Sequence, residues 1–519
     1  MSEFVSGPQA WVGAWSEKRA ELSPDRVGLV DASTGRRFSY ADLDERANRT
    51  ARLLRARGVD REDRVAVVSR TRPEVVDLFL ATAKTGSVLA PLSHRLAPPE
   101  LAALLGRVDP ALLVVEAPFL EGTRTALDEA EGVETTVVAV EAADDEASPA
   151  ADTPTYVETV PTDDGPVETP PLSPDDTHLL LHTGGSTGTP KETVISHRAV
   201  VWNSLNTIAS WGLRPDDVTP LTFPTFHTGG WNVVTVPVWH IGGTVVIARE
   251  FDPGQLLATV EREGASVLVA VPAVLRMLTD HDDWAETDLS TLRVVKSGGG
   301  PCRDAVMAAW WDRGVDLSQG YGLTECGPNN FAMPDGWPRE KAATVGKPAM
   351  HVDARVVADG EPVEPGAVGE LQLRSPHAAA GYLDDAAESE AAFGSGWVAT
   401  GDLASVDADG YYTIEGRKKD MFVSGGENVY PSEVEAVLAE HDAVDEVVVV
   451  PVPDDQWGEV GKAVLEGDES LTLADVESFC DGRLAPYKVP KHIAFVESMP
   501  TSGPEKIDRQ AVADRFGER

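Results

Sequence analysis

A segment rich in glycine and hydroxyl groups follows a short apolar run and ends in a lysine: His182-Thr-Gly-Gly-Ser-Thr-Gly-Thr-Pro-Lys191. Glycine lets the backbone approach a ligand closely, so its N–H groups can point at anionic oxygens. A Walker loop has glycine directly before its lysine, whereas Pro190 stands there in this chain. We therefore predict a polyphosphate-binding loop of another kind, formed by Thr183, Gly184, Gly185, Ser186, Thr187, Gly188, Thr189 and Lys191.

A second segment, residues 319–325, combines an aromatic ring, glycines and a carboxylate in the order Gln-Gly-Tyr-Gly-Leu-Thr-Glu. Tyr321 offers a flat face on which adenine can stack. Glu325 is a hard oxygen ligand of the kind that Mg²⁺ prefers. A lone Thr-Glu pair is also typical of a helix N-terminus. We predict that this segment binds a nucleotide through Gly320, Tyr321, Gly322 and Thr324, and a metal ion through Glu325.

Two residues further along could hold a sugar. Asp402 ends the run Trp-Val-Ala-Thr-Gly-Asp, and Arg417 ends the run Tyr-Tyr-Thr-Ile-Glu-Gly-Arg. A carboxylate can accept both hydroxyl groups of a ribose, and a guanidinium can reinforce the ribose or a phosphate. Taken alone, Thr-Gly-Asp is only a turn. The prediction that Asp402 and Arg417 bind a sugar therefore depends on the presence of the other segments.

Together these segments resemble the motifs of the adenylate-forming superfamily, which includes acyl-CoA synthetases, luciferases and peptide-synthetase adenylation domains. The resemblance implies an ATP-dependent ligase in which Thr187 and Lys191 serve the phosphates and Glu325 holds a Mg²⁺ ion that bridges them. One departure is Glu192, which replaces the glycine that usually follows the lysine and adds an acid beside the phosphate site.

The resemblance also assigns the base and the sugar. It implies that a turn after residue 297 reads adenine through Gly299, Gly300 and Pro301, although such a glycine run is equally a plain loop. It further implies that Asp402 and Arg417 clamp the ribose.

The C-terminal part carries the remaining roles that the resemblance implies. Lys419 falls at a hinge about which a small domain rotates between the two half-reactions. Lys506 matches the lysine that reaches the junction of the carboxylate and the α-phosphate, while Thr501 and Glu505 replace the family's usual basic residue and glycine in that loop. The tunnel for coenzyme A would be lined by Gly425, Gly426 and Glu427.

Residues 223–231, Phe-Pro-Thr-Phe-His-Thr-Gly-Gly-Trp, resemble the family's acid pocket, in which His227 flanks the reacting carboxylate. Trp231 stands where some fatty-acid members carry a gating tryptophan, and Gly229 and Gly230 leave space. With the apolar run 233–238, this favours a medium- or long-chain fatty acid over acetate. An aryl acid such as a benzoate or cinnamate remains open, and Trp231 is equally a core residue.

The predicted reaction begins with an in-line attack of the carboxylate on the α-phosphate of ATP, which releases pyrophosphate. Because the nucleophile is already anionic, the site must position groups and neutralise phosphate charge rather than supply a base. Coenzyme A then takes the acyl group and AMP departs. The alternatives are loading of a carrier protein, a luciferase-like oxidation and, outside enzymology, nucleotide binding without catalysis. The absence of a carrier segment favours a stand-alone CoA ligase.

The elements that must position these residues predict an α/β fold. Short β-branched runs such as 64–69 alternate with helical patterns such as 40–54, which implies parallel sheets between layers of helices. We predict a large N-terminal domain of layered sheets and helices over residues 1–416 and a small mobile α+β domain over 417–519. Residues 141–176 are rich in Asp, Glu, Pro, Thr and Ser, which predicts an exposed acidic linker without packed structure.

Composition limits the partners. Eighty-five Asp and Glu residues against 44 Lys and Arg give a formal net charge of −41, which would repel nucleic acid and anionic membranes. Because the acids occur along the whole chain, we interpret them as an adaptation to high salt, as in a halophile, with an ordinary acidic enzyme as the alternative.

Neither a long apolar run nor a signal peptide is present, which predicts a cytoplasmic protein without a transmembrane segment. Three widely separated cysteines predict buried thiols. The expected partners are a small carboxylic acid, ATP, coenzyme A and Mg²⁺, and a homodimer stays possible.

Overall fold

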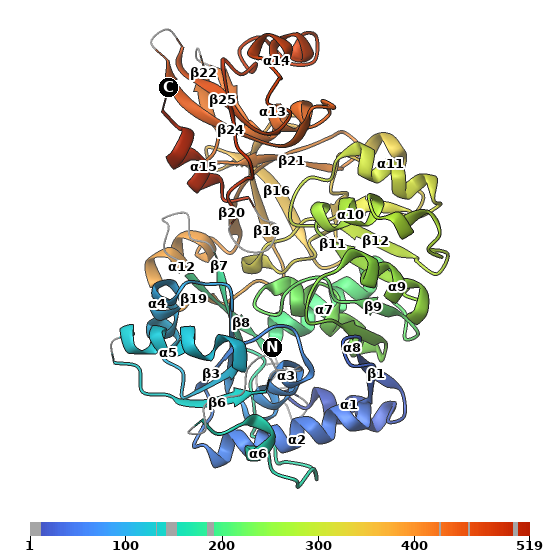
Figure 1. The fold of residues 1–519 in the computed structure, drawn as a ribbon, viewed down its shortest axis with the longest axis vertical. Coiled ribbons are helices and arrows are strands. Elements are labelled where there is room, and N and C mark those ends of the chain that lie inside the picture. The colour runs from blue at the N-terminus through green and yellow to red at the C-terminus, as the bar shows by residue number, and fades with distance from the viewer. Residues whose placement is uncertain are drawn as a thin grey trace.

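The computed structural model describes residues 12–130, 132–141, 153–183, 191–424, 427–454, 457–501 and 507–518. It has a large body that ends at β21 (Tyr412–Arg417) and a smaller body at the C-terminal end (Figure 1). Both bodies combine sheets with helices. The predicted α/β class, with a large N-terminal and a small C-terminal domain, is confirmed.

The widest sheet has the strand order β19-β8-β7-β4-β3-β5-β6. Strands β7 to β6 run parallel, whereas β8 and β19 pair antiparallel. Helices cover both faces, which is why Val and Leu fill the inner strands. The bounds are β3 (Arg64–Val68), β4 (Val88–Leu92), β5 (Leu112–Glu116), β6 (Thr136–Val140), β7 (Thr177–Thr183), β8 (Lys191–Ser196), β19 (Gly381–Tyr382), α2 (Tyr40–Ala56), α3 (Pro73–Thr85), α4 (Pro98–Val108) and α5 (Leu120–Glu129).

Two further sheets complete the layered part of the large body. One has the order β2-β1-β10-β9, and the other is the parallel sheet β11-β12-β13, in which Ser297 and Gln319 lie side by side. The bounds are β1 (Val27–Asp31), β2 (Arg36–Ser39), β9 (Val218–Pro220), β10 (Thr244–Ile247), β11 (Val267–Ala270), β12 (Val294–Ser297), β13 (Leu317–Gln319), α1 (Trp15–Leu22), α7 (His197–Trp211), α8 (Thr235–Ile241), α9 (Pro253–Glu263), α10 (Pro272–Thr279) and α11 (Asp304–Asp312).

An antiparallel sheet with the order β17-β16-β18-β20-β21 leads to the small body. Its strand β18 alternates buried and partly exposed residues, as expected where one face is covered. The bounds are β14 (Phe331–Ala332), β15 (Lys347–Pro348), β16 (Asp353–Ala358), β17 (Glu361–Pro362), β18 (Gly369–Arg374), β20 (Val398–Val406) and α12 (Ala386–Phe393).

The small body has its own sheet and core. Strands β24 and β25 form a long antiparallel pair, and two helices pack on it through Val434, Leu438, Val476 and Cys480. The bounds are β22 (Phe422–Ser424), β23 (Glu427–Val429), β24 (Val444–Asp454), β25 (Gly458–Gly467), β26 (His492–Phe495), α13 (Pro431–Leu438), α14 (Leu473–Cys480) and α15 (Arg509–Phe516).

The prediction of an unpacked acidic linker is wrong for residues 153–176. Tyr156, in the short helix α6 (Tyr156–Thr159), and Leu172 are buried, and the Tyr156 hydroxyl lies 2.5 Å from Thr50 Oγ1 on α2. Arg49 on α2 pairs with Asp164 at 2.8 Å. Composition alone predicted the wrong structure because Tyr156 and Leu172 are buried and the arginines of α2 pair with acidic residues. These contacts hold an otherwise polar segment against the large body.

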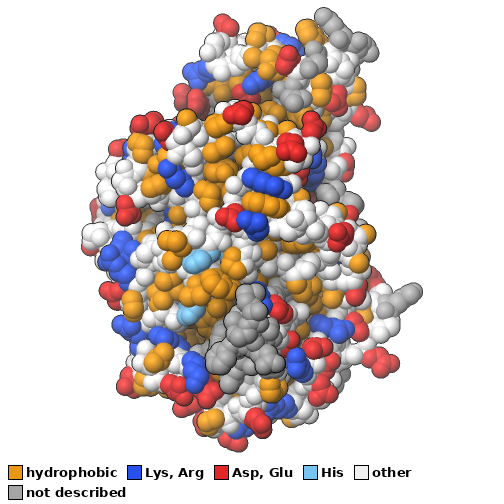
Figure 2. Space-filling view, turned by 180° about the vertical axis from the view of Figure 1, so that it is seen from behind, with side chains coloured by type: hydrophobic (Ala, Val, Ile, Leu, Met, Phe, Trp, Pro, Cys, Tyr) orange, Lys and Arg blue, Asp and Glu red, His pale blue; other side chains and the backbone are white. Residues whose placement is uncertain are grey.

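Within the described ranges, no helix is long and apolar enough to cross a membrane. The three cysteines are buried thiols, as predicted. On the face shown in Figure 2, Asp and Glu side chains are spread over both bodies and do not gather in one patch. The interpretation of this charge as an adaptation to high salt stays a prediction.

Candidate active site

A cavity of about 2260 Å³ lies between the sheets of the large body and the small body. It exceeds the roughly 300–1,000 Å³ of a typical small-molecule pocket, so it has room for several substrates. Segments far apart in the sequence converge on it. The predicted site residues that line it are Thr183, His227, Gly299, Gly300, Pro301, Gly320, Tyr321, Gly322, Thr324, Glu325, Asp402 and Arg417.

The predicted phosphate loop connects β7 to β8. These strands pair antiparallel, so Thr183 and Lys191 lie opposite one another at the two ends of the loop. The Lys191 ammonium is 2.7 Å from a carboxylate oxygen of Glu388 on α12 and 5.1 Å from the centre of the Tyr382 ring. A phosphate that binds Lys191 would therefore compete with Glu388. The loop residues Gly184, Gly185, Ser186, Thr187, Gly188 and Thr189 lie outside the described residues.

Glu325, in the 3₁₀ turn Thr324–Cys326, accepts a hydrogen bond of 3.0 Å from the Tyr382 hydroxyl. The same ring lies below the Lys191 ammonium, so Tyr382 connects the predicted metal ligand to the predicted phosphate ligand. Nothing in the dipeptide Gly381-Tyr382 signals a ligand site in the sequence.

Glu325 also bears on whether a Mg²⁺ ion fits. Among the described residues, no group of three or more His, Cys, Asp and Glu side chains could enclose a metal. Mg²⁺ in nucleotide enzymes typically takes one or two carboxylates and completes its shell with substrate phosphates and water. A cavity-lining carboxylate that contacts the same tyrosine as Lys191 fits that mode of binding, and the metal role of Glu325 stays a prediction.

Asp402, on β20, is held from two sides. Its Oδ1 pairs with Arg417 Nε at 2.7 Å across the β20–β21 ladder, and its Oδ2 accepts a hydrogen bond from the Tyr321 hydroxyl. Burial and the neighbouring Asp402 charge raise the pKa of Tyr321 well above its ordinary value, so this phenol remains a donor. The predicted ribose ligand is therefore fixed in position by the protein alone.

In the two predicted adenine segments, glycine is required at different positions for different structural reasons. Gly299 has a φ of +87°, which favours glycine, whereas a Cβ on Gly300 would meet nothing within 4 Å. At Gly322 a Cβ would lie 2.0 Å from the Pro328 carbonyl oxygen, so packing requires glycine. The Gly320 N–H donates to the Ser297 carbonyl at 2.7 Å, which joins the two segments.

Glu192 does not lie beside the phosphate site, contrary to the prediction. Successive residues of a strand point to opposite faces, and Val194, on the same face as Glu192, packs in the core beneath α4. Glu192 is 1% exposed, and neither carboxylate oxygen has a hydrogen-bond partner among the described residues. Burial raises the pKa of Glu192 to about 7, against the lowering effect of the Arg107 charge.

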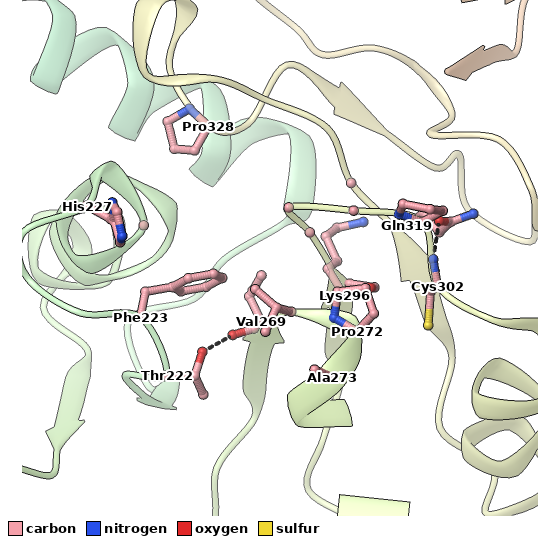
Figure 3. Close-up of a pocket in the computed structure, with 18 of the residues that line it drawn as sticks. Thr222, Phe223, His227, Val269, Pro272, Ala273, Lys296, Cys302, Gln319 and Pro328 are labelled. Atoms are coloured by element: carbon pink, nitrogen blue, oxygen red, sulfur yellow. Dashed lines mark hydrogen bonds between the residues drawn. The ribbon is translucent and has the colours of Figure 1, made fainter. Parts of the chain in front are cut away.

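The other end of the cavity is largely apolar (Figure 3). Phe223 and Val269 form one wall with Pro272, and His227 lies beyond them. The role of His227 beside the reacting carboxylate stays a prediction. The Thr222 hydroxyl donates to the Val269 carbonyl at 2.6 Å, which fixes this wall to β11. Gly229 does not provide space for the acid, because a Cβ there would lie 2.7 Å from the Phe223 ring.

Trp231 does not line the cavity, and this corrects its predicted place in the acid pocket. It lies in the π-helical turn Gly229–Val233 with no exposed surface. Its indole N–H donates to the Thr225 carbonyl at 2.7 Å, and its ring stacks on Phe79 at 4.3 Å with an interplanar angle of 8°. We assign Trp231 to the hydrophobic core.

Sequence reasoning missed Lys296, a buried residue of β12 that lines the cavity. The available signal was a positive charge at the end of the apolar run 294–295. It also missed Glu388, which no local pattern marks because its partner Lys191 is 197 positions away.

The hinge residue Lys419 is exposed in a turn between β21, the last strand of the large body, and β22, the first of the small body. This is the location expected of a hinge, and the rotation stays a prediction. Glu427 is exposed at the start of β23. The other predicted residues of this part, Gly425, Gly426 and Lys506, lie outside the described residues.

A family model described as AMP-binding enzyme matches residues 16–383, and one described as AMP-binding enzyme C-terminal domain matches residues 433–506. The chain belongs to the AMP-binding enzymes. The resemblance to the adenylate-forming superfamily is thereby confirmed, and this AMP-binding enzyme is an ATP-dependent acid–CoA ligase that forms AMP.

Several CoA ligases are similar to this AMP-binding enzyme over nearly their full length. It is 35% identical over 515 residues to the feruloyl-CoA synthase of Amycolatopsis sp, covering 98% of this chain and 99% of that protein. It is 35% identical over 505 residues to the indoleacetate–CoA ligase of Aromatoleum aromaticum, covering 96% of each. It is 31% identical over 510 residues to the long-chain-fatty-acid–CoA ligase FadD13 of Mycobacterium tuberculosis, covering 97% and 98%.

Solved structures give the same result. The anthranilate CoA ligase AuaEII in complex with anthranoyl-AMP matches with a TM-score of 0.88 and 26% identity over 98% of each chain. ATP-bound MatB from Rhodopseudomonas palustris matches with a TM-score of 0.87 and 28% identity over 98% and 99%. The protein is therefore an acyl- or aryl-CoA ligase, and the names of its relatives leave the acid open.

Proposed function

We propose that this protein joins an aromatic carboxylic acid to coenzyme A through an acyl-adenylate. The observation that carries the proposal is the acid end of the cavity, where the ring of Phe223 forms a wall and where Trp231 does not serve as a gate, since it is in the core. A flat aromatic acid suits such a wall because aromatic rings gain from stacking. Relatives named for feruloyl and indoleacetate substrates support this choice.

A medium- or long-chain fatty acid is the second candidate. The 31% identity to a long-chain-fatty-acid–CoA ligase favours it. The sequence-based preference for a fatty acid relied on Trp231 as a gate and on Gly229 and Gly230 as space. Neither reason supports a fatty acid in the folded structure, because Trp231 is buried and Phe223 fills the space at Gly229.

The predicted site residues would divide the work of the first half-reaction. His227 would orient the acid, and Asp402 with Arg417 would hold the ribose so that the α-phosphate faces the carboxylate. Lys191 would exchange Glu388 for a phosphate oxygen. Glu325 would hold Mg²⁺, which when bound neutralises phosphate charge. Lys506 would act at the reacting oxygens, and coenzyme A would complete the second half-reaction.

Acid-dependent pyrophosphate release, followed with and without coenzyme A, tests the proposal. The panel contains cinnamate, benzoate and indoleacetate against octanoate and palmitate. We expect kcat/KM to be highest for an aromatic acid, with a thioester formed only when coenzyme A is present. A higher value for octanoate or palmitate would favour the second candidate. No release with any acid would contradict the ligase activity itself.

A further inference from the structure

Two turns from different parts of the cavity wall are held by the same helix, α7. One is the π-helical turn Gly229–Val233, which follows His227 in the predicted acid pocket. The other, residues 321–330, carries predicted ligands of the nucleotide. His227 and Pro328, at these two turns, both line the cavity (Figure 3). Toward the turns α7 contributes three buried polar residues: Asn203, Asn206 and Thr207.

The acid turn needs a hydrogen-bond donor from outside its own backbone. In an α-helix the carbonyl of Val233 would accept from the N–H four positions on, but Pro237 stands there and has no N–H. The Asn329 side chain replaces this donor, because its Nδ2 donates to the Val233 carbonyl at 2.8 Å. On the neighbouring carbonyl, that of Asn232, Asn203 Nδ2 donates at 2.5 Å. The turn is therefore held by one asparagine of α7 and one of the nucleotide segment.

The same helix fixes the nucleotide segment at Asn329. Asn206 Nδ2 donates to the Asn329 carbonyl at 2.8 Å, and Asn329 Nδ2 donates to Thr207 Oγ1 at 2.8 Å. The backbone N–H of the next residue, Asn330, donates to the Tyr321 carbonyl at 3.0 Å, which closes the segment on itself. A displacement at Tyr321 is therefore passed to Asn329 and from there to α7 and to the acid turn.

These bonds lie in the interior of the large body. Asn206 and Thr207 have no exposed surface, and Asn203 and Asn329 are 2% and 3% exposed. A buried amide is costly unless it is hydrogen-bonded, and hydrogen bonds, unlike apolar contacts, are lost steeply when their geometry changes. Connected bonds in a buried network also strengthen one another. The two turns are thus joined by contacts that transmit a change of position.

We propose that Asn203, Asn206, Thr207 and Asn329 form a bridge that couples the two sites, so that a bound nucleotide orders the turn that receives the acid. They are positioning residues, since their side chains hold the backbone of the two turns. By linkage, the acid strengthens nucleotide binding by the same factor. The inference rests on the proposed function only in taking the turn after His227 as part of the acid site, and it applies to an aromatic and to a fatty acid alike.

Hydrogen–deuterium exchange tests the bridge without an acid. The ligand is α,β-methylene-ATP with Mg²⁺ at saturation, and the proteins are the wild type, Asn329→Leu and Thr207→Val. The matched control is Thr123→Val on α5, because Thr123 and Thr207 are both buried and each donates to the carbonyl four residues earlier at 2.8 Å. We expect the analogue to slow amide exchange in residues 229–233 at least about fivefold in the wild type and in the control. In both bridge variants this slowing should be lost, while residues 319–325 are still protected.

Equal slowing in the wild type and in both bridge variants would overturn the proposal, as would no slowing in the wild type. Thermal unfolding checks that the variants fold. Thr207→Val keeps the shape of the side chain and removes one acceptor, so it serves if Asn329→Leu does not fold.

Calorimetry then measures the coupling itself, as the ratio of the Kd of the acid without and with the analogue. The acid is the one with the highest kcat/KM in the panel above, so a preference for a fatty acid leaves this test intact. The ratio should be at least about five in the wild type and close to one in Asn329→Leu. A merely structural role would weaken binding and lower the unfolding temperature without changing the ratio, and that result would refute the bridge. If no acid of the panel is used, the proposed function fails, and the exchange experiment still decides the bridge.

Discussion

Around the predicted nucleotide site charged side chains pair with one another, whereas at the acid end of the cavity one lysine lies close to apolar residues. Lys191 pairs with Glu388, and Asp402 pairs with Arg417 and accepts from Tyr321. Lys296, in contrast, has a hydroxyl group and an indole ring as its neighbours.

The difference indicates two ways of preparing a site for a charged ligand. Where the protein supplies the partner, the polar group is held in position before the substrate arrives, and little reorganisation is needed at the moment of reaction. Where the protein supplies only a neutral partner, as it does for Lys296, the buried charge is less well stabilised, because a hydroxyl group offsets less of the desolvation cost than a carboxylate does.

The largest effect should come from Trp231→Ala, which tests whether the acid end is bounded by core packing. Removing a fully buried indole that stacks on Phe79 should lower the free energy of unfolding by about 3–5 kcal/mol. Urea unfolding measures this loss. Trp231→Phe keeps the stacking but loses the bond to Thr225 and should cost less. A stable Trp231→Ala protein with altered acid selectivity would return Trp231 to the pocket.

Asp402→Ala breaks the internal pairing at the nucleotide end. It removes the predicted ribose ligand and leaves Arg417 and Tyr321 without their shared partner. A hydrogen bond to a charged group contributes about 1.5–3 kcal/mol, so loss of the bonds that the Asp402 carboxylate would make to the ribose should lower kcat/KM for ATP by roughly 10- to 100-fold. The KM for the acid should change little. Asp407→Ala, whose carboxylate pairs with Lys341 outside the cavity, is the control, and an equal effect of both would argue against the ribose role.

Glu192→Gln tests a carboxyl group that is buried on the opposite face of β8 from Lys191 and that lacks a partner among the described residues. Its folded-state pKa of about 7 is raised from 4.5, so the ionised form destabilises the fold. The penalty is absent below pH 4.5, grows as the pH rises toward 7 and is complete above it. We expect Glu192→Gln to be more stable than the wild type at pH 8, by at most about 3 kcal/mol, and equal at pH 4. Thermal unfolding at both pH values measures this, with Glu121→Gln on the surface of α5 as the control. A gain that does not depend on pH would contradict it.

The smallest effect is expected from Glu388→Ala, which frees Lys191 from its internal partner. The Glu388 side chain is 47% exposed, and exposed partners contribute at most about 1 kcal/mol. The KM for ATP should therefore fall by a few-fold at low salt, with the difference narrowing as salt is added. Glu390→Ala, on the same helix, is the control, and a rise in the KM for ATP would show that Glu388 assists rather than competes.

Local pattern was sufficient for a large part of the fold. The strand predicted at 64–69 and the helix predicted from Tyr40 correspond to β3 and α2, because residue periodicity and capping act over a few positions. The strands β16 to β21 were not predicted from the sequence. They depend on antiparallel partners such as Asp402 and Arg417, whose pairing no local pattern encodes.

The sequence by itself determined the chemistry, because glycine spacing and charge type mark the segments of Lys191, Glu325 and Asp402 wherever the chain places them. Only the tertiary structure decided how those charges are partnered. The contact of Lys191 with Glu388 spans 197 positions, and the burial of Trp231 and Lys296 depends on elements that meet only when the chain is folded. Burial and pairing are properties of the surroundings of a side chain. The sequence therefore predicted the nucleotide from its motifs, but it did not identify the acid, whose pocket depends on those surroundings.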